Sequence, residues 1–174
     1  MLNHLKKILS IFIIFNLTFV SSAQAAATFN DINGDGSGFD ISGQETVPRG
    51  LTFNNDGTKM FVVGDNGNDI NEYTLSVGFD LTSTVTHVGE FDISDQETNP
   101  QGIAFNTTGT KMFIVGNAGN DINEYTLTTP FDVSTSIFRD INGDGTGFDV
   151  SAQDTVPQFI KFNNDGTKMF VIGN

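Results

Sequence analysis

Short apolar segments separated by polar turns run through most of this chain, and their spacing predicts an all-β fold. Leu51–Phe53 and Lys59–Val63 are runs rich in Phe, Val and Thr, joined by the polar letters NNDGT. An Asp-Gly step between two apolar runs predicts a hairpin turn, because glycine adopts the positive φ that such turns need. Alternate residues of the second run, such as Met60 and Phe61, point to opposite faces, and both faces are apolar. We therefore expect this strand to be buried on both sides.

The rest of this unit predicts two further strands and a loop. Ile70–Leu75 alternates between apolar and polar residues, with Tyr73 on one side and Glu72 on the other. We expect this strand to be less deeply buried than the one before it. A fourth strand is expected at about Val85–Ile93. The segment QETVPRG, which begins at Gln44, contains Pro and Gly and is expected to be a crossing loop rather than a strand.

The unit is repeated along the chain. Copies begin at Phe39, Phe91 and Phe148, so the spacing is 52 and then 57 residues, and the third copy breaks off at Asn174. Near-identity at this spacing indicates an array of equivalent units that bury their faces against their neighbours. Four antiparallel strands in each unit, with the second strand buried on both faces, predict β-propeller blades. A β-solenoid is the competing architecture, but its coils are usually shorter and lack paired hairpin turns.

Two motifs carry a resemblance to a known group of proteins. The letters P-x-G-[LI]-x-F-N-x-x-G-T-K-M-F-[VI]-V-G, followed by N-D-I-N-E-Y-T-L, are similar to the secreted bacterial β-propeller repeats of the YVTN and lactonase-like group. The resemblance covers essentially all of residues 26–174. It implies blades of four antiparallel strands, with about two complete blades plus partial ones. It implies no single function, because such propellers include binding proteins, surface proteins and some enzymes.

On this interpretation the ring of blades is unfinished. Phe29–Ser42 matches Phe138–Ser151 and is expected to be the outer strand of another blade, while the third copy has two inner strands and no third strand. Propellers close with roughly 4–8 blades, and open ends leave unpaired apolar edges. We favour a fragment of a longer propeller protein. Self-association through the open blade edges and a decayed gene product are the alternatives.

The first 25 residues are predicted to be a signal peptide. A short basic start, an apolar run at Ile8–Val20 and the pair Ala23-x-Ala25 fit cleavage before Ala26. A retained anchor is the alternative, but the uncharged run is shorter than the roughly 20 residues of a membrane span. We expect residues 26–174 to be the repeat region, to have no membrane span, and to be secreted to the periplasm, the cell surface or the extracellular space.

Composition narrows the choice of partners. The chain carries 21 Asp and Glu against 8 Lys and Arg, a net charge of −13, and it has no cysteine. An acidic surface repels nucleic acid and anionic lipid, so no nucleic-acid partner is expected. Neither disulfides nor thiol chemistry can contribute. The acidity either keeps an exported protein soluble or provides carboxylates for divalent cations.

The loop DINGDG occurs twice and offers oxygen ligands at alternate positions before a glycine, which suits calcium. The candidate calcium ligands are Asp31, Asn33, Asp35, Asp140, Asn142 and Asp144. The loop lacks the bidentate Glu that ends an EF-hand loop, and the acid expected at position 9 of a propeller calcium loop comes one place late. The alternative is an Asn-Gly-Asp-Gly turn within an insertion near the outer strand. If calcium binds, we expect it to stiffen the outer edge of a blade rather than to catalyse a reaction.

No catalytic set is evident, and no position is seen that breaks the repeat symmetry. His87, the one histidine after the first 25 residues, is expected to be a surface residue of an outer strand. Five acids recur at equivalent places and would form rings of carboxylates, for cations or sugar hydroxyls. They are Glu72 and Glu124 in INEY, and Glu45, Glu97 and Asp154 in Q-[ED]-T. We favour a simpler interpretation, in which they are solvated edge residues and the Q-[ED]-T acids hydrogen-bond the crossing loop.

Two functions remain open at this point. The favoured one is an exported propeller segment that acts as a binding or interaction scaffold for a protein or carbohydrate ligand. The alternative is a propeller enzyme of the lactonase or lyase kind whose catalytic residues lie outside this chain. We favour the role without catalysis, and apart from calcium no cofactor is expected.

Overall fold

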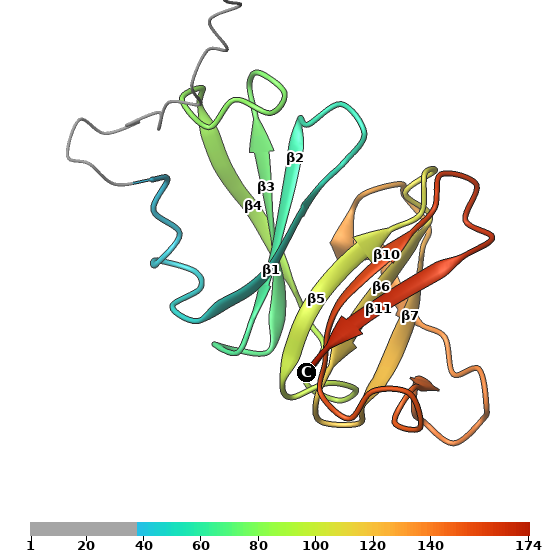
Figure 1. The fold of residues 1–174 in the computed structure, drawn as a ribbon. Helices are drawn as coiled ribbons and strands as arrows, with labels where there is room; N and C mark the ends of the chain where they lie inside the picture. The colour runs from blue at the N-terminus through green and yellow to red at the C-terminus, as the bar shows by residue number, and fades with distance from the viewer. Residues whose placement is uncertain (1–37) are drawn as a thin grey trace, which may run out of the picture.

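The computed structural model describes residues 38–174, which form three antiparallel sheets (Figure 1). The first sheet contains β1 (Pro48–Phe53), β2 (Lys59–Gly64), β3 (Asp69–Leu75) and β4 (Val85–Asp92), in that order. The second contains β5 (Pro100–Phe105), β6 (Lys111–Gly116), β7 (Asp121–Leu127) and β8 (Ser136–Phe138), with β9 (Phe148–Asp149) also paired to β7. The third contains β10 (Pro157–Phe162) and β11 (Met169–Gly173). A 3₁₀ turn, η1 (Val133–Thr135), precedes β8.

Each sheet is an up-and-down meander, and we call the three sheets the first, second and third blades. Their innermost strands lie next to one another, with β1 beside β5 and β5 beside β10 (Figure 1). The expectation of an all-β fold with two complete four-stranded blades and partial ones is thereby confirmed. The predicted signal peptide and the first DINGDG loop lie outside the described residues. Between residues 38 and 174 no helix is long and apolar enough to cross a membrane.

The blades pack face to face through the second strand of each unit, as the sequence predicts. Phe61 is fully buried and stacks at 4.6 Å between ring centroids on Phe105 of the second blade. Phe113 repeats this contact one blade further on, at 4.5 Å from Phe162. Met60 points to the opposite face and belongs to a separate core cluster. The first and second blades therefore each bury one face of the second strand against the next blade.

Two expectations about the strands are wrong. The segment that begins at Gln44 is not all loop, because β1 starts at Pro48, and the bulge after that residue accommodates its missing N–H. The third strand is as buried as the second: Asn71 is 0% exposed and Glu72 5%. Its polar side chains are enclosed because neighbouring blades and the crossing loop cover both faces of the sheet.

The second DINGDG loop interrupts an outer strand. The first blade has one continuous outer strand, β4, whereas the second blade has β8 and β9 with residues 139–147 between them. Both fragments still pair with β7. The longer spacing of the second unit therefore corresponds to an excursion of the outer edge, as the alignment predicts, and the blade remains four strands wide.

Candidate functional site

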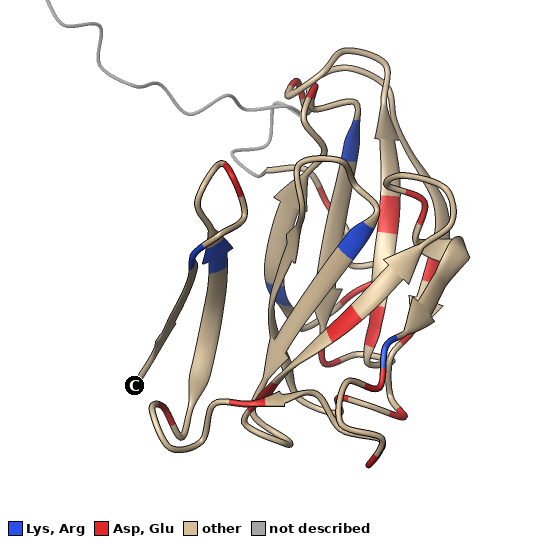
Figure 2. Ribbon diagram, turned by 90° about the vertical axis from the view of Figure 1, so that its right-hand side faces the viewer, with Lys and Arg blue, Asp and Glu red and all other residues tan. Residues whose placement is uncertain are grey.

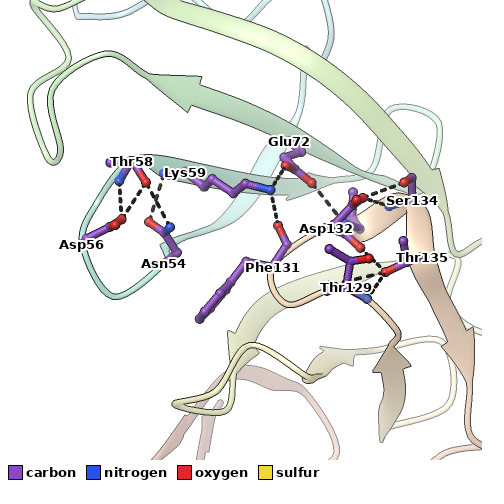
Figure 3. Close-up of polar contacts among 11 residues, drawn as sticks. Asn54, Asp56, Thr58, Lys59, Glu72, Thr129, Phe131, Asp132, Ser134 and Thr135 are labelled. Carbon is purple, nitrogen blue, oxygen red and sulfur yellow. Dashed lines mark hydrogen bonds and ion pairs between the residues drawn. The ribbon is translucent and has the colours of Figure 1, made fainter.

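A partly buried ion pair of the first blade contacts the second blade (Figure 3). Lys59 Nζ donates to Glu72 Oε1 at 2.6 Å and to the carbonyl oxygen of Phe131 at 2.7 Å. Glu72 Oε2 accepts the backbone N–H of Val133 at 3.0 Å. The Glu72 side chain is only 7% exposed, so both of its oxygens are committed to these contacts. This pair acts as a structural link between two sheets that share no strand.

The conformation of the turn that Lys59 and Glu72 contact in the second blade is set by the turn's own residues. Phe131 has φ of 55°, a left-handed conformation, and its ring packs over Gly109 in the hairpin turn of the same blade. Asp132 caps η1, because its Oδ1 accepts the backbone N–H and the hydroxyl of Ser134. These contacts direct the Phe131 carbonyl and the Val133 N–H out of the turn, where Lys59 and Glu72 meet them (Figure 3).

The same pair recurs in the second blade. Lys111 Nζ donates to Glu124 Oε1 at 2.8 Å, and Arg139 lies 3.8 Å from the same oxygen. The Glu124 side chain is 14% exposed, twice the exposure of Glu72. The expectation that these two acids are solvated edge residues is wrong. They lie on the strand face against which the next blade packs.

The acids of the crossing loops are also buried. Glu97 is 0% exposed and Glu45 1%. Glu97 Oε1 accepts the backbone N–H groups of Asn99 at 2.6 Å and Ala118 at 3.1 Å. The hydrogen-bonding role predicted for these acids is confirmed, and their predicted solvation is wrong. Asp154, the third copy, keeps one such bond, from the backbone N–H of Val156 at 2.9 Å.

Glycine makes this burial feasible. Gly116 ends β6, and a Cβ at this position would overlap the Glu97 carboxyl group. Gly64 stands in the same relation to Glu45. The carboxyl group thus occupies the space that a side chain on the strand would need. Substitution of either glycine would displace a buried acid.

A second acid lies beside each of these carboxyl groups. Gly116 pairs directly with Asp121 across β6 and β7, and Gly64 pairs with Asp69 across β2 and β3. Burial raises the pKa of Glu97 and of Asp121 above the usual values; the charge of Asp121 raises that of Glu97 further, and the charges of Asp149 and Asp144 raise that of Asp121. Burial, followed by the charges of Glu90 and Glu45, raises the pKa of Asp69 to about 6. Each complete blade therefore contains two neighbouring carboxyl groups, both buried in the second blade and one buried and one half-buried in the first.

The second DINGDG loop has a well-defined hydrogen-bond pattern. Asp140 accepts the backbone N–H groups of Gly143 at 2.6 Å, Asp144 at 3.1 Å and Gly145 at 3.0 Å. Asp144 Oδ1 accepts the N–H and hydroxyl of Thr146, and Asn142 is exposed. The carboxylates of this loop stabilise its own turn. Calcium binding here stays a prediction, and so does binding by Asp31, Asn33 and Asp35, which precede the described residues.

Acidic residues dominate the charged surface without forming a cluster of three. Figure 2 shows Asp and Glu positions along many strands and loops of the ribbon, with fewer Lys and Arg positions between them. Among residues 38–174, no three His, Cys, Asp or Glu side chains gather closely enough to hold a metal ion. His87 lies half-buried on β4, with its ring 5.2 Å from that of Tyr73. The side chain packs on the sheet rather than beside an acid.

A cavity of about 530 Å³ crosses the inner strands of all three blades. Its walls combine apolar and aromatic side chains with amides and a cation. The lining includes Leu51, Phe105, Asn106, Phe159, Lys161 and Asn163. This cavity offers a ligand room beside both apolar and polar groups.

Two lining residues of the third blade differ from both earlier copies of the repeat. Phe159 occupies the position of Gly50 and Gly102, and Lys161 occupies that of Thr52 and Ala104. A Cβ on Gly50 would lie 3.0 Å from the Cα of Gly102, so glycine lets adjacent inner strands approach closely. The expectation that no position breaks the symmetry is therefore wrong. The sequence alone shows both differences, because the third copy reads PQFIKF where the first two read PRGLTF and PQGIAF.

Comparison with known proteins identifies the fold. No protein-family model matches the chain, and no curated protein sequence matches it. A solved structure of a protein of unknown function from Desulfotomaculum acetoxidans matches with a TM-score of 0.53 and 18% identity, over 74% of this chain and 35% of that one. A 6-phosphogluconolactonase candidate from Bacteroides uniformis matches with a TM-score of 0.52 and 10% identity, over 72% of this chain and 33% of that one. The chain spans about a third of the length of these structures.

These matches and the sheet topology define the class of protein. The described chain is a run of β-propeller blades, similar in fold to lactonase-like propellers. Identity this low shows the fold alone, and the activity of a relative is not thereby transferred to this chain.

Proposed function

We propose that this chain is a segment of an exported β-propeller of the YVTN and lactonase-like group, and that it acts as a binding scaffold for carbohydrate. The observation that carries the proposal is the cavity on the inner strands, because Phe159 and Lys161, which differ from both earlier copies of the repeat, line it. A repeat array that only builds a ring has no need of a unique residue at its axis. A unique aromatic ring and a unique cation at one strand suit recognition of one ligand.

The chemistry of the lining favours a sugar. The exposed ring of Phe159 offers an apolar face to the C–H groups of a pyranose, and the Asn106 and Asn163 amides provide donors and acceptors for hydroxyl groups. The repeated acids have other roles. Glu72 is occupied by Lys59 and the second blade, and Glu97 by the crossing loop. In such a scaffold the repeated charged residues stabilise the blades, and the residues that differ between the copies bind the ligand.

Calorimetric titration of the chain with cellotetraose and with tetragalacturonate tests the proposal. We expect one of the two oligosaccharides to bind, and Phe159→Gly to weaken that binding at least about tenfold. Lys161→Ala separates the two ligands, because it weakens binding of the acidic sugar alone. Both substitutions restore residues that the second blade already has, so the strand is expected to fold. Lys168→Ala, which changes an exposed cation outside the cavity lining, is the matched control.

Failure of both sugars to bind, or equal binding by wild type and Phe159→Gly, would contradict this function. The enzymatic alternative has its own test. Turnover of gluconolactone by the purified chain, lost in Lys161→Ala and kept in Lys168→Ala, would replace the scaffold with a propeller enzyme.

A further inference from the structure

Buried oxygen atoms without a hydrogen-bond donor recur at the same four repeat positions in both complete blades. In the first blade they belong to Glu45, Asp65, Asn68 and Asn71, and in the second to Glu97, Asn117, Asn120 and Asn123. A buried acceptor that lacks a partner costs about 1–3 kcal/mol. The same four positions recur 52 residues apart, which indicates that these oxygens have the same role in both blades.

These residues belong to one turn and to the acid that contacts it. The turn joins the second strand of a blade to the third, at residues 65–68 and again at 117–120. In the second blade the backbone N–H of Ala118 fixes Glu97 Oε1 onto the turn. Oε2 of Glu97 lies against Gly116, the residue paired with Asp121. Residues paired in this way have adjacent side-chain positions on one face of the sheet, so Glu97 and Asp121 present their carboxyl groups side by side.

A fully buried amide oxygen completes this set. Asn123 is 0% exposed, two residues after Asp121 and on the same face of β7. Its Nδ2 donates to Asp121 Oδ1 at 2.9 Å, which leaves Oδ1 as the end of the amide without a partner. Asn71 repeats both features in the first blade, with its Nδ2 2.7 Å from Asp69 Oδ1. The atoms without a partner on these eight residues are all acceptor oxygens, which suits a cation.

The local charge points the same way. Asp149 pairs directly with Asp121 across β7 and β9, and Asp92 pairs directly with Asp69 across β3 and β4. Arg139 lies against Glu124, whereas Arg49 bonds Asp65 on the turn of the first blade, where its charge also acts on Glu45. A further acid thus lies beside each pair of carboxyl groups, and no lysine or arginine of the described chain bonds to Asp69 or Asp121.

We propose that each complete blade binds one calcium ion at this turn, with Glu45, Asp69 and Asn71 as ligands in the first blade and Glu97, Asp121 and Asn123 in the second. Calcium takes carboxylate and amide oxygens together, fills its remaining positions with backbone carbonyls or water, and tolerates irregular geometry. Only two carboxylates are needed in each set, because amides supply the other side-chain oxygens. The proposal does not depend on the carbohydrate function.

The DINGDG loop has a secondary role in this arrangement. Gly147 at its end donates its N–H to Asp121 Oδ2 at 2.9 Å, so the loop closes over the turn of the second blade. Asp140 and Asp144 are occupied by the backbone of the loop itself. The loop covers the ion in this blade, while its own carboxylates are not the ligands.

Terbium, which substitutes for calcium and emits when a nearby tyrosine is excited, gives a direct test. The chain has two tyrosines and no tryptophan, and Tyr73 and Tyr125 each lie two residues after the proposed asparagine ligand. We expect sensitised emission from the metal-free full chain, and calcium should abolish it by competition. Tyr125→Phe removes one antenna and no ligand, so it should reduce the emission to about half without changing calcium binding measured by calorimetry.

Ligand variants complete the experiment. Glu97→Gln with Asp121→Asn should remove one of the two calcium ions, and Asp140→Asn with Asp144→Asn should remove neither. Circular dichroism checks that each variant is folded, and Tyr125→Phe remains informative if the ligand variant is not. Absence of sensitised emission and calcium heat would overturn the proposal, and so would binding lost in the Asp140 and Asp144 variant alone. The proposal would also be overturned if Asp121→Asn raised the free energy of unfolding and calcium had no effect on the protein. That result would mean that Glu97 and Asp121 share a proton.

Discussion

Glu72 in the first blade accepts a hydrogen bond at 3.0 Å from the backbone N–H of Val133 in the second blade, 61 residues further along the chain. The same carboxylate holds Lys59, whose ammonium group also reaches the second blade. Breaking this contact leaves a buried charge without its partner. This side chain therefore adds to the coupling that the packing of β1 and β2 on β5 already provides.

Glu72→Gln is expected to lower the free energy of unfolding by about 1–3 kcal/mol, because the neutral amide weakens the bond to Lys59 and leaves that cation poorly compensated. Urea denaturation followed by circular dichroism measures the change. Asp95→Asn, at an exposed acid of the second crossing loop, is the control and should change stability by less than about 0.5 kcal/mol. Equal effects of the two substitutions would show that the Glu72 contact contributes nothing.

Gly116→Ala is expected to destabilise the protein by about 1–3 kcal/mol, because the new methyl group meets the buried Glu97 carboxyl group. Gly89→Ala in β4 is a matched control, since a Cβ there has nothing within 4 Å. Thermal unfolding of the two variants under one buffer condition compares them. A Gly116 variant as stable as the Gly89 variant would mean that Glu97 can leave its pocket at no cost.

Stability in calcium-free buffer is expected to fall as the pH rises from about 4 to about 7. The pKa of Asp69 is raised to about 6 by burial, so the folded state favours the protonated carboxyl group. This contribution is complete below the unfolded pKa, near 3.9, and is lost as the pH rises through the folded pKa. Burial shifts the pKa of Glu97 and of Asp121 in the same direction.

Asp69→Asn should reduce this dependence, because the amide does not titrate. Urea midpoints recorded across the pH range with a chelator present measure it, with Asp95→Asn as the control that leaves the slope unchanged. A midpoint that rises over this range, or a slope that Asp69→Asn does not alter, would exclude a raised pKa at Asp69.

The open face of the third blade is expected to promote self-association. Phe170 is 53% exposed and Ile172 62%, whereas Phe61 and Val63, which occupy the same positions in the first blade, are fully buried against the second. Replacing both residues by serine should lower the mass seen by light scattering at high protein concentration. Val88→Ser, at an exposed apolar residue of β4, should leave the mass unchanged. An unchanged mass in the double variant would place any association elsewhere.

The hairpins and the packing of the second strands follow from the sequence, because turn letters and alternating apolar residues are local signals. The burial of Glu97 does not follow from a local signal. It depends on Gly116 in β6, because the Glu97 carboxyl group fills the space that a side chain on this glycine would occupy. The link from Glu72 to Val133 is likewise set by the packing of two blades rather than by any local pattern. Lys161 is different, because comparison of the three repeats was enough to single it out.

Hydrogen exchange at the Val133 amide, compared between wild type and Glu72→Gln, most directly tests the claim that repeated charges join the blades. We expect slow exchange in the wild type, with one cooperative opening shared by β3 and β7, and fast exchange at Val133 in the variant. Fast exchange of this amide in the wild type, or separate unfolding of the first and second blades, would contradict the claim.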